Sequence, residues 1–478
     1  MLRRYPVYVD SGVWWLGKVP EHWAQLPGKA CYREKKTSNA GMRESKVLSL
    51  SYGKIVVKPT DTLHGLVPES FETYQIVEAG DIVVRPTDLQ NDWNSLRFAL
   101  SLERGIITSA YMCLRTRAVI TPELGHLLLH TYDMKKVFYG LGSGLRQNLD
   151  WRDFKYLPCL VPPLLEQSAI VRYLGYMDRR VRRYIRAKQK LITLLSEQKQ
   201  AIIQSVVTRG LDSDVRLKPS GVEWLGEVPE HWEVKRLRNL TTHVTSGSRG
   251  WSDFAADDGP LFLRIGNLTR DSLELDLQDV VRLNLPSSVV GETARTRVMP
   301  DDILLSITAY IGSVAVVPHD LGEAYVSQHV ACCRLTLGAA NPRWIGYVLL
   351  SPVGQTHGSL CMYGGTKQGL SLDDVGNYVV VLPPRGEQDR AVDRIEDQIA
   401  TVDSLLGSTR RKVDLVREHH TRLVADVVTG NLDVHEAAAR LPHETDELEP
   451  SDAIADVAVG DDVSLEGDAE AALEEVEI

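Results

Sequence analysis

Two long segments of the chain place apolar residues at the spacing of a helix. Between Glu166 and Thr208 there is no proline and a single glycine, Gly175, so nothing there stops a helix. Steps of four and three residues give an apolar seam with a few polar interruptions: Ile170, Leu174, Met177, Val181, Tyr184, Lys188, Leu191, Leu195, Gln198 and Ile202. A second seam runs from Val392 to Val427. Each predicts a long helix whose obvious partner is the other copy, with two unrelated amphipathic helices as the alternative.

Short apolar runs separated by turn residues fill the segments before these helices, residues 24–160 and 233–381. The runs predict strands at 82–85, 111–115, 261–265, 303–307, 314–317 and 378–382, and a helix at 343–350. Each segment is therefore predicted to be an α+β domain with a curved antiparallel sheet.

Three motifs occur twice. SGVWWLGKVPEHW at 11–23 recurs at 220–232 with 11 of 13 positions identical, VPPLLEQ at 161–167 matches LPPRGEQ at 382–388, and VVTRGLD at 206–212 matches VVTGNLD at 427–433. The first pair is displaced by 209 residues and the other two by 221. Each repeat therefore joins a part of variable length to a part of fixed length, as expected for loops joined to packed helices.

The offset of 221 also aligns Arg146-Gln147-Asn148-Leu149 with Lys367-Gln368-Gly369-Leu370, so the variable parts are two versions of one domain. The predicted organisation is a first domain at 1–165, a first helix at 166–210, a second domain at 211–385, a second helix at 386–432 and an acidic tail at 433–478.

Charge is distributed unevenly. The net charge is −10, but no Lys or Arg follows Arg440, and residues 444–478 hold 14 Asp and Glu, which leaves residues 1–443 at +4. The tail is predicted to be disordered. Its simplest role is a solubilising extension, and a regulatory or DNA-mimicking role is the alternative. The first helix is basic, which fits either a solvated face or a face near DNA phosphates or an acidic partner.

Catalytic and metal-binding motifs are missing from the sequence. There is no P-loop, no amino-methyltransferase motif, no HExxH, no CxxC and no GxSxG. His22 and His231 of PEHW are expected to be structural, and Asp301-Asp302 and Asp373-Asp374 to be strand-end or helix-cap residues. Neither a signal peptide nor a run of about 18 apolar residues is evident, and the six cysteines are too sparse for a disulfide framework, which together suggest the cytoplasm.

Two glycine-rich polar stretches, GLGSGLRQNL at 140–149 and YGGTKQGLSL at 363–372, hold the candidate contacts. Glycine lets a backbone approach a ligand closely, while Lys, Arg and Gln bond phosphates or base edges. Simple turns are the alternative. The candidate DNA-contacting residues are Arg146, Gln147, Lys367 and Gln368, with Arg264 and Asn267 from LFLRIGNLT.

The duplicated SGV-x-WLG-x-VPEHW, PP-x-x-EQ and VVT-x-x-LD motifs resemble the specificity subunit of type I restriction–modification enzymes, over residues 5 to about 440. The resemblance implies two target-recognition domains that each read one part of a bipartite DNA site. It also implies that the two long helices pack as an antiparallel coiled coil and act as a spacer. Trp14 stands where the second copy has Glu223, and Pro27 where that copy continues differently, so the first domain is expected to begin differently.

As expected partners, the resemblance implies double-stranded DNA, two methyltransferase subunits and endonuclease/translocase subunits. The chain itself is expected to be non-catalytic and to bind no cofactor, because S-adenosylmethionine, ATP and magnesium belong to the partner subunits. A protein-interaction scaffold with duplicated binding domains is the main alternative. A complete enzyme, such as a fused methyltransferase, is a further one, but the sequence lacks its cofactor motif.

Overall fold

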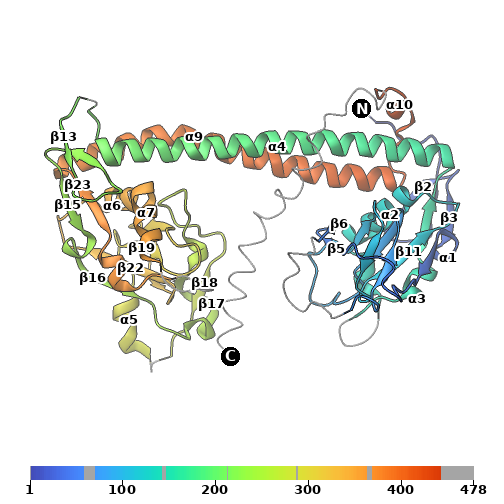
Figure 1. Ribbon diagram of the computed structural model, residues 1–478, viewed down its shortest axis with the longest axis horizontal. Helices are drawn as coiled ribbons and strands as arrows, with labels where there is room; N and C mark the ends of the chain where they lie inside the picture. Colours follow the sequence, from blue (N-terminus) through green and yellow to red (C-terminus); the bar gives the residue numbers. More distant parts are fainter. Residues whose placement is uncertain are drawn as a thin grey trace. The chain divides into compact units, whose positions relative to one another are not determined.

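The computed structural model describes residues 2–58, 70–142, 147–212, 214–286, 289–362 and 369–442, and Figure 1 shows their secondary structure. These residues form two compact units. Unit 1 comprises the described residues up to Ala187 and those from Lys412 to Pro442, and unit 2 those from Lys188 to Arg411. Each unit therefore contains the first half of one long helix and the last half of the other. Within these ranges no helix combines the length and apolar character needed to cross a bilayer.

The two predicted long helices are present as α4 (Leu164–Arg209) and α9 (Arg385–Val428). Each starts directly after a Pro-Pro pair, where a proline lacks only an N–H that no helical bond would use. In each unit the two helices run in opposite directions (Figure 1). Asp178 faces His420 in unit 1, and in unit 2 Leu195 packs with Val402 and Leu406.

Unit 1 carries the first domain. Its helices are α1 (Gly28–Cys31), α2 (Pro122–Met134), the 3-10 helix η2 (Val137–Gly140), α3 (Trp151–Lys155) and α10 (His435–Ala439). Its strands are β1 (Tyr8–Asp10), β2 (Lys18–Pro20), β3 (Ala24–Pro27), β4 (Tyr32–Lys35), β5 (Leu48–Ser51), β6 (Lys54–Val57), β7 (Gln75–Val77), β8 (Asp81–Val84), β9 (Phe98–Leu100), β10 (Gly105–Ile107), β11 (Met112–Thr116) and β12 (Pro158–Val161). The central sheet has the antiparallel order β4-β11-β8-β9.

Unit 2 carries the second domain. Its helices are α5 (Val290–Thr296), α6 (Pro342–Leu350), α7 (Pro352–Cys361) and α8 (Leu372–Gly376), with 3-10 helices η3 (Leu237–Asn239), η4 (Trp251–Phe254) and η5 (Ile265–Asn267). Its strands are β13 (Leu217–Pro219), β14 (Glu227–Pro229), β15 (Glu233–Arg236), β16 (Thr241–Ser246), β17 (Ala255–Leu263), β18 (Val281–Leu283), β19 (Ile303–Ser306), β20 (Val314–Val316), β21 (Ala324–Val326), β22 (Val330–Leu335) and β23 (Val379–Leu382). The equivalent sheet has the order β16-β22-β19-β20.

These elements confirm the α+β prediction, since all six predicted strands and the helix at 343–350 are present. The ends shift by one residue at most, except that β17 begins six residues before its predicted start and ends two residues before its predicted end. One strand pair differs, because β17 and β21 are parallel. Pro27 does not change how the first domain begins. Strand β3 pairs with β12 in unit 1 just as β15 pairs with β23 in unit 2.

Each domain shares one apolar core with the long helices of its unit. In unit 1, Ile170 and Leu174 of α4 and Leu423 and Val427 of α9 join the core beneath α2. In unit 2, residues 203–207 of α4 and 391–399 of α9 join the core of the second domain. Residues 433–442, assigned to the tail, extend this packing in unit 1, since α10 forms there and Val434 is buried. The rest of the predicted tail lies outside the described residues.

Candidate nucleic-acid interface

A glutamate in the first turn of each long helix holds the PEHW motif of its unit. The Glu166 carboxylate, 2% exposed, accepts hydrogen bonds from Trp23 Nε1 at 2.9 Å and from Tyr5 Oη at 2.5 Å, and it lies 2.9 Å from His22 Nε2. Burial and the bond to Glu166 raise the pKa of Tyr5. PEHW is therefore a structural clamp, as expected for its histidine.

The second unit repeats this clamp. Glu387 accepts from Trp232 Nε1 at 3.0 Å and lies 2.8 Å from His231 Nε2. The left-handed Gly210 closes the same site, since a Cβ there would lie 3.1 Å from the indole of Trp232. The two copies of PEHW and PP-x-x-EQ thus recur because each pair forms the same attachment.

The glutamine that follows each glutamate binds the backbone just before a helix of its domain, α2 in unit 1 and α6 in unit 2. Gln167 Oε1 accepts from Thr121 N at 2.8 Å, and its Nε2 donates to Val119 O and Pro162 O, both at 2.9 Å. Gln388 accepts from Asn341 N at 2.7 Å and donates to Pro383 O at 2.8 Å. Thr121 and Asn341 cap α2 and α6, so the glutamines fix where these helices start.

Both glycine-rich stretches are anchored on the residue that follows the same central strand. Leu149 N donates to Pro86 O at 2.8 Å after β8, and Leu370 N donates to Ile307 O at 2.9 Å after β19. Both donors and both acceptors are related by the offset of 221 found in the sequence. The equivalence predicted from the alignment therefore holds in backbone geometry.

A buried aspartate at the start of that strand holds the turn that leads into it. Asp81 pairs with Arg115 at 2.7 Å, and Asp302 pairs with Arg334 at 2.6 Å. The same carboxylates accept from the backbone N of Glu78 and of Met299, each at 2.8 Å. The acidic pairs thus act as predicted. Asp302 lies at the start of its strand, and Asp374 completes the capping box of α8.

Of the six candidate contacts, three can be placed. Arg146, Lys367 and Gln368 lie outside the described residues. Gln147 is half-buried beside the anchor and has a φ of +44°, a conformation uncommon for residues other than glycine. Its contact with DNA stays a prediction.

Arg264 and Asn267 lie together at η5. Asn267 is buried, accepts from Arg264 N at 2.9 Å, and donates to Asp276 O at 2.8 Å and Asp279 O at 2.9 Å. Because its amide is used within the loop, contact with a base would require that loop to open. Arg264 Nη2 lies 3.5 Å from the exposed Asp279 carboxylate. Its role in DNA binding also stays a prediction.

Sequence analysis did not identify Arg97, which holds the segment that follows β8 in unit 1. Arg97 is fully buried and donates to Thr87 O and Asp92 O, both at 2.6 Å, inside the segment after β8. This segment presents Trp93, which is 52% exposed and whose ring lies 4.6 Å from that of Tyr139, tilted by 31°. Exposed aromatic rings stack on bases. No sequence signal distinguishes Arg97 from the surface arginines.

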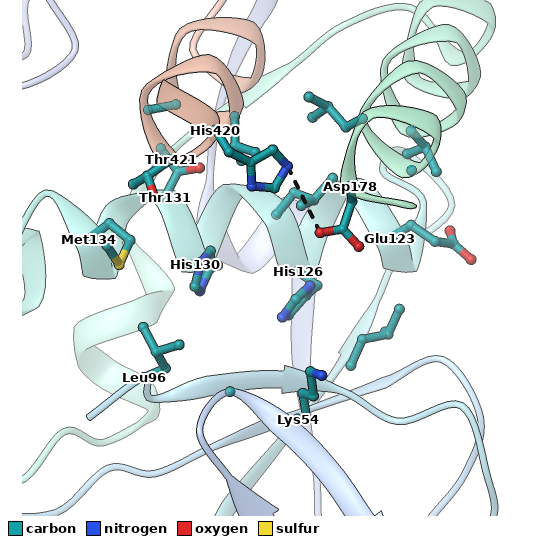
Figure 2. Close-up of a pocket in the computed structure, with 18 of the residues that line it drawn as sticks. Lys54, Leu96, Glu123, His126, His130, Thr131, Met134, Asp178, His420 and Thr421 are labelled. Carbon is teal, nitrogen blue, oxygen red and sulfur yellow. Dashed lines mark ion pairs between the residues drawn. The ribbon is translucent and has the colours of Figure 1, made fainter. Parts of the chain in front are cut away.

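Unit 1 also contains a cavity of about 420 Å³ between α2, β9, α4 and α9 (Figure 2). His126 and His130 project from α2, and His420 of α9 lies 3.9 Å from Asp178 of α4. Burial lowers the pKa of all three histidines, that of His126 to about 4. The lining also includes Lys54, Glu123, Thr131 and Thr421.

The cysteines are buried or half-buried. The six cysteines form no disulfide, and burial raises the pKa of Cys113 and of Cys333 to about 12. Among the residues that the structure describes, no cluster of His, Cys, Asp or Glu could hold a metal ion. The described parts of the chain are thus two versions of one domain, each attached to the helix pair of its unit.

Known proteins that resemble the chain in sequence are specificity subunits of type I restriction enzymes. No protein-family model matches the chain. The specificity subunit of the type I restriction enzyme MjaVIII from Methanocaldococcus jannaschii is 22% identical over 364 residues, which span 74% of this chain and 81% of the relative. The putative MjaX specificity subunit from the same organism is 20% identical over 88% of this chain and 96% of the relative. The EcoBI specificity subunit from Escherichia coli is 24% identical over 57% and 58%.

One solved structure agrees in fold. A chain from a study of complex assembly in a type I restriction–modification system has a TM-score of 0.58 at 17% identity and covers 87% of this chain and 99% of its own length. The HsdS subunit from Thermoanaerobacter tengcongensis covers similar shares with a TM-score of 0.39. The resemblance to type I specificity subunits, which are non-catalytic recognition subunits, is thereby confirmed. These relatives do not favour the scaffold alternative.

Proposed function

We propose that the chain is the non-catalytic DNA-recognition subunit of a type I restriction–modification complex and that it reads a bipartite site. The observation that supports this most is the equal anchoring of two glycine-rich loops, at Leu149 and Leu370, on domains that otherwise diverge. Two equivalent loops of different sequence are what two different half-sites require. Lys and Arg near these loops would bind phosphates, while Gln would read base edges.

The partners and cofactors follow from this function. The chain would dock two methyltransferase subunits and endonuclease/translocase subunits, and it would act in the cytoplasm on double-stranded DNA. S-adenosylmethionine, ATP and magnesium would be bound by the partners. Titration of S-adenosylmethionine into the isolated chain should give no saturable binding, and saturable binding would overturn the non-catalytic assignment.

The deciding experiment compares the methylomes of cells with the gene intact, deleted, or changed in one loop. Deletion should remove one bipartite methylated motif. Replacing residues 363–372 with the loop of a different specificity subunit should change one half of the motif and leave the other half intact. The matched control replaces residues 140–149 and should change the opposite half. A deletion that leaves every methylated motif in place, in cells with an active partner methyltransferase, would contradict the proposal.

A further inference from the structure

Two segments of opposite charge are explained neither by the fold nor by the proposed function. Between Arg172 and Lys190, α4 has eight Lys and Arg against one acidic residue, Asp178. Residues 443–478 have 14 Asp and Glu and no Lys or Arg. We propose that this acidic tail binds exposed arginines of α4 in unit 1 and competes there with DNA phosphates.

The arginines concerned lie on one side of the helix. Positions seven and eleven residues apart fall on the same face at about 100° per residue, whereas the apolar seam falls on the opposite face. We call three exposed residues on and beside this face the arginine face: Arg179, Arg180 and Arg183. Within the described ranges none of the three has a carboxylate at ion-pair distance, whereas Arg182 pairs with Asp178 at 2.8 Å. The arginine face therefore presents three cations that no described carboxylate neutralises.

The chain reaches the start of the acidic tail on this same helix. Arg172 Nη2 donates to Leu441 O and to Pro442 O, both at 3.1 Å, and Pro442 is the last described residue. Arg172 is two turns before Arg179 on the same face, so the arginine face begins about 10 Å along the helix and ends about 16 Å along it. The tail is thus tethered beside the surface that complements its charge.

The length of the tail makes the contact easy to reach. A random coil of 36 residues, the length of the segment 443–478, has a root-mean-square extension of roughly 30–36 Å, and like charges extend such a coil further. That exceeds the distance to the arginine face, so the effective concentration is on the order of millimolar. Individual exposed ion pairs are weak, and salt screens them. The contact should therefore be collective, easily displaced and lost at high ionic strength.

Zero-length cross-linking of the full chain tests the contact without DNA. A carbodiimide joins lysine amines to carboxylates, so the double variant Arg179→Lys/Arg183→Lys should cross-link to acidic residues of 444–478, as mapped by mass spectrometry. Lys18 and Lys29, exposed lysines elsewhere in unit 1, are the internal control and should cross-link several-fold less. The preference should vanish in about 0.5 M salt. Equal cross-linking at all exposed lysines, or a preference that salt does not change, would overturn the proposal.

The competition with DNA rests on the proposed function and is measured separately. A full chain with every Asp and Glu of 444–478 changed to Asn or Gln should bind a random-sequence duplex more tightly. Its slope of log K against log salt should be steeper by about 2–3, because each freed phosphate contact contributes about 0.9. When Arg179, Arg180 and Arg183 are all changed to Ala, chains with the native tail and with the neutralised tail should have equal slopes of log K against log salt. Equal slopes in the native background would refute the competition. If neither chain binds duplex, the proposed function fails, while the cross-linking result still decides whether the tail contacts α4.

Discussion

Removing the Glu166 carboxylate should be one of the most destabilising single changes in unit 1. It accepts two buried hydrogen bonds, from Trp23 and from Tyr5. It also bonds to His22, whose side chain is 46% exposed. Hydrogen bonds to charged groups contribute about 1.5–3 kcal/mol each, and a buried donor left unpaired costs more than the lost bond alone. Glu166→Ala should therefore lower the free energy of unfolding by about 3–5 kcal/mol, with the exposed histidine adding little.

The second clamp provides an internal comparison. Glu387 has one buried partner, Trp232, and its own side chain is 17% exposed. Glu387→Ala should therefore cost less, about 2–3 kcal/mol. Glu166→Gln keeps one carbonyl acceptor and should be intermediate between Glu166→Ala and the native chain. Glu197→Ala, an exposed acidic position on α4, should change stability by at most about 0.5 kcal/mol.

Urea unfolding followed by tryptophan fluorescence measures these differences. Because the two units can unfold separately, hydrogen exchange over residues 5–23 and 161–170 should be followed as well. Glu166→Ala should speed exchange in both segments at once, since the clamp joins them. A loss below about 1 kcal/mol, or faster exchange in only one of the two segments, would refute the assignment of Glu166 as the joint.

Three further predictions concern the long helices and the cavity. Gly175→Ala should stabilise the chain by about 0.5–1 kcal/mol in urea unfolding, because the added Cβ would meet only Arg179 at 3.7 Å and glycine is a poor helix former; a loss of stability would show that the site is tighter. The folded-state pKa of His126 is lowered to about 4 from its usual 6.5, so its neutral form is favoured by folding, and stability should be complete above about pH 6.5 and fall as pH drops toward 4. His126→Gln should flatten that decline in pH-dependent thermal unfolding, and an unchanged profile would exclude this histidine as its source. Asp403→Ala should destabilise unit 2 more than Lys199→Met, since it leaves the 3% exposed ammonium of Lys199 without this 2.6 Å partner, whereas Lys199→Met keeps the buried stem and leaves only the 44% exposed Asp403; a larger loss for Lys199→Met would contradict that reasoning.

The long helices and the domain class could be predicted because local pattern determines them. Proline at 162–163 and 383–384 and the apolar seams that follow place the starts of α4 and α9 within two residues. The short strands were also recoverable, since apolar runs between turn residues specify a strand without reference to its partner. The pairing of β3 with β12, more than a hundred residues apart, has no such local signal.

The clamps and the loop supports were not predictable because they depend on tertiary contacts. The repeated Glu-Gln pair was recognised as a motif, but nothing in its sequence shows that the glutamate binds PEHW and the glutamine binds the loop before α2. No sequence pattern marks Arg97. Its guanidinium can be buried because it donates to backbone carbonyl groups of the segment after β8. The candidate contacts were inferred from residue type alone. Residue type does not show that the Asn267 amide binds carbonyl groups of its own loop.

The arrangement of the clamps explains why the repeat keeps one part constant while the other varies. Glu166 and Gln167 fix the start and the middle of the first domain from a single helical turn, and Glu387 and Gln388 do the same for the second. Everything between those attachment points can change in length without moving the domain on its helix. The difference of 12 residues between the two copies falls between PEHW and Asp81 or Asp302, whereas both glycine-rich loops lie nearer the helix start and keep the common offset of 221. The domains can therefore differ between the two copies while the helix pair and its two clamps stay as they are.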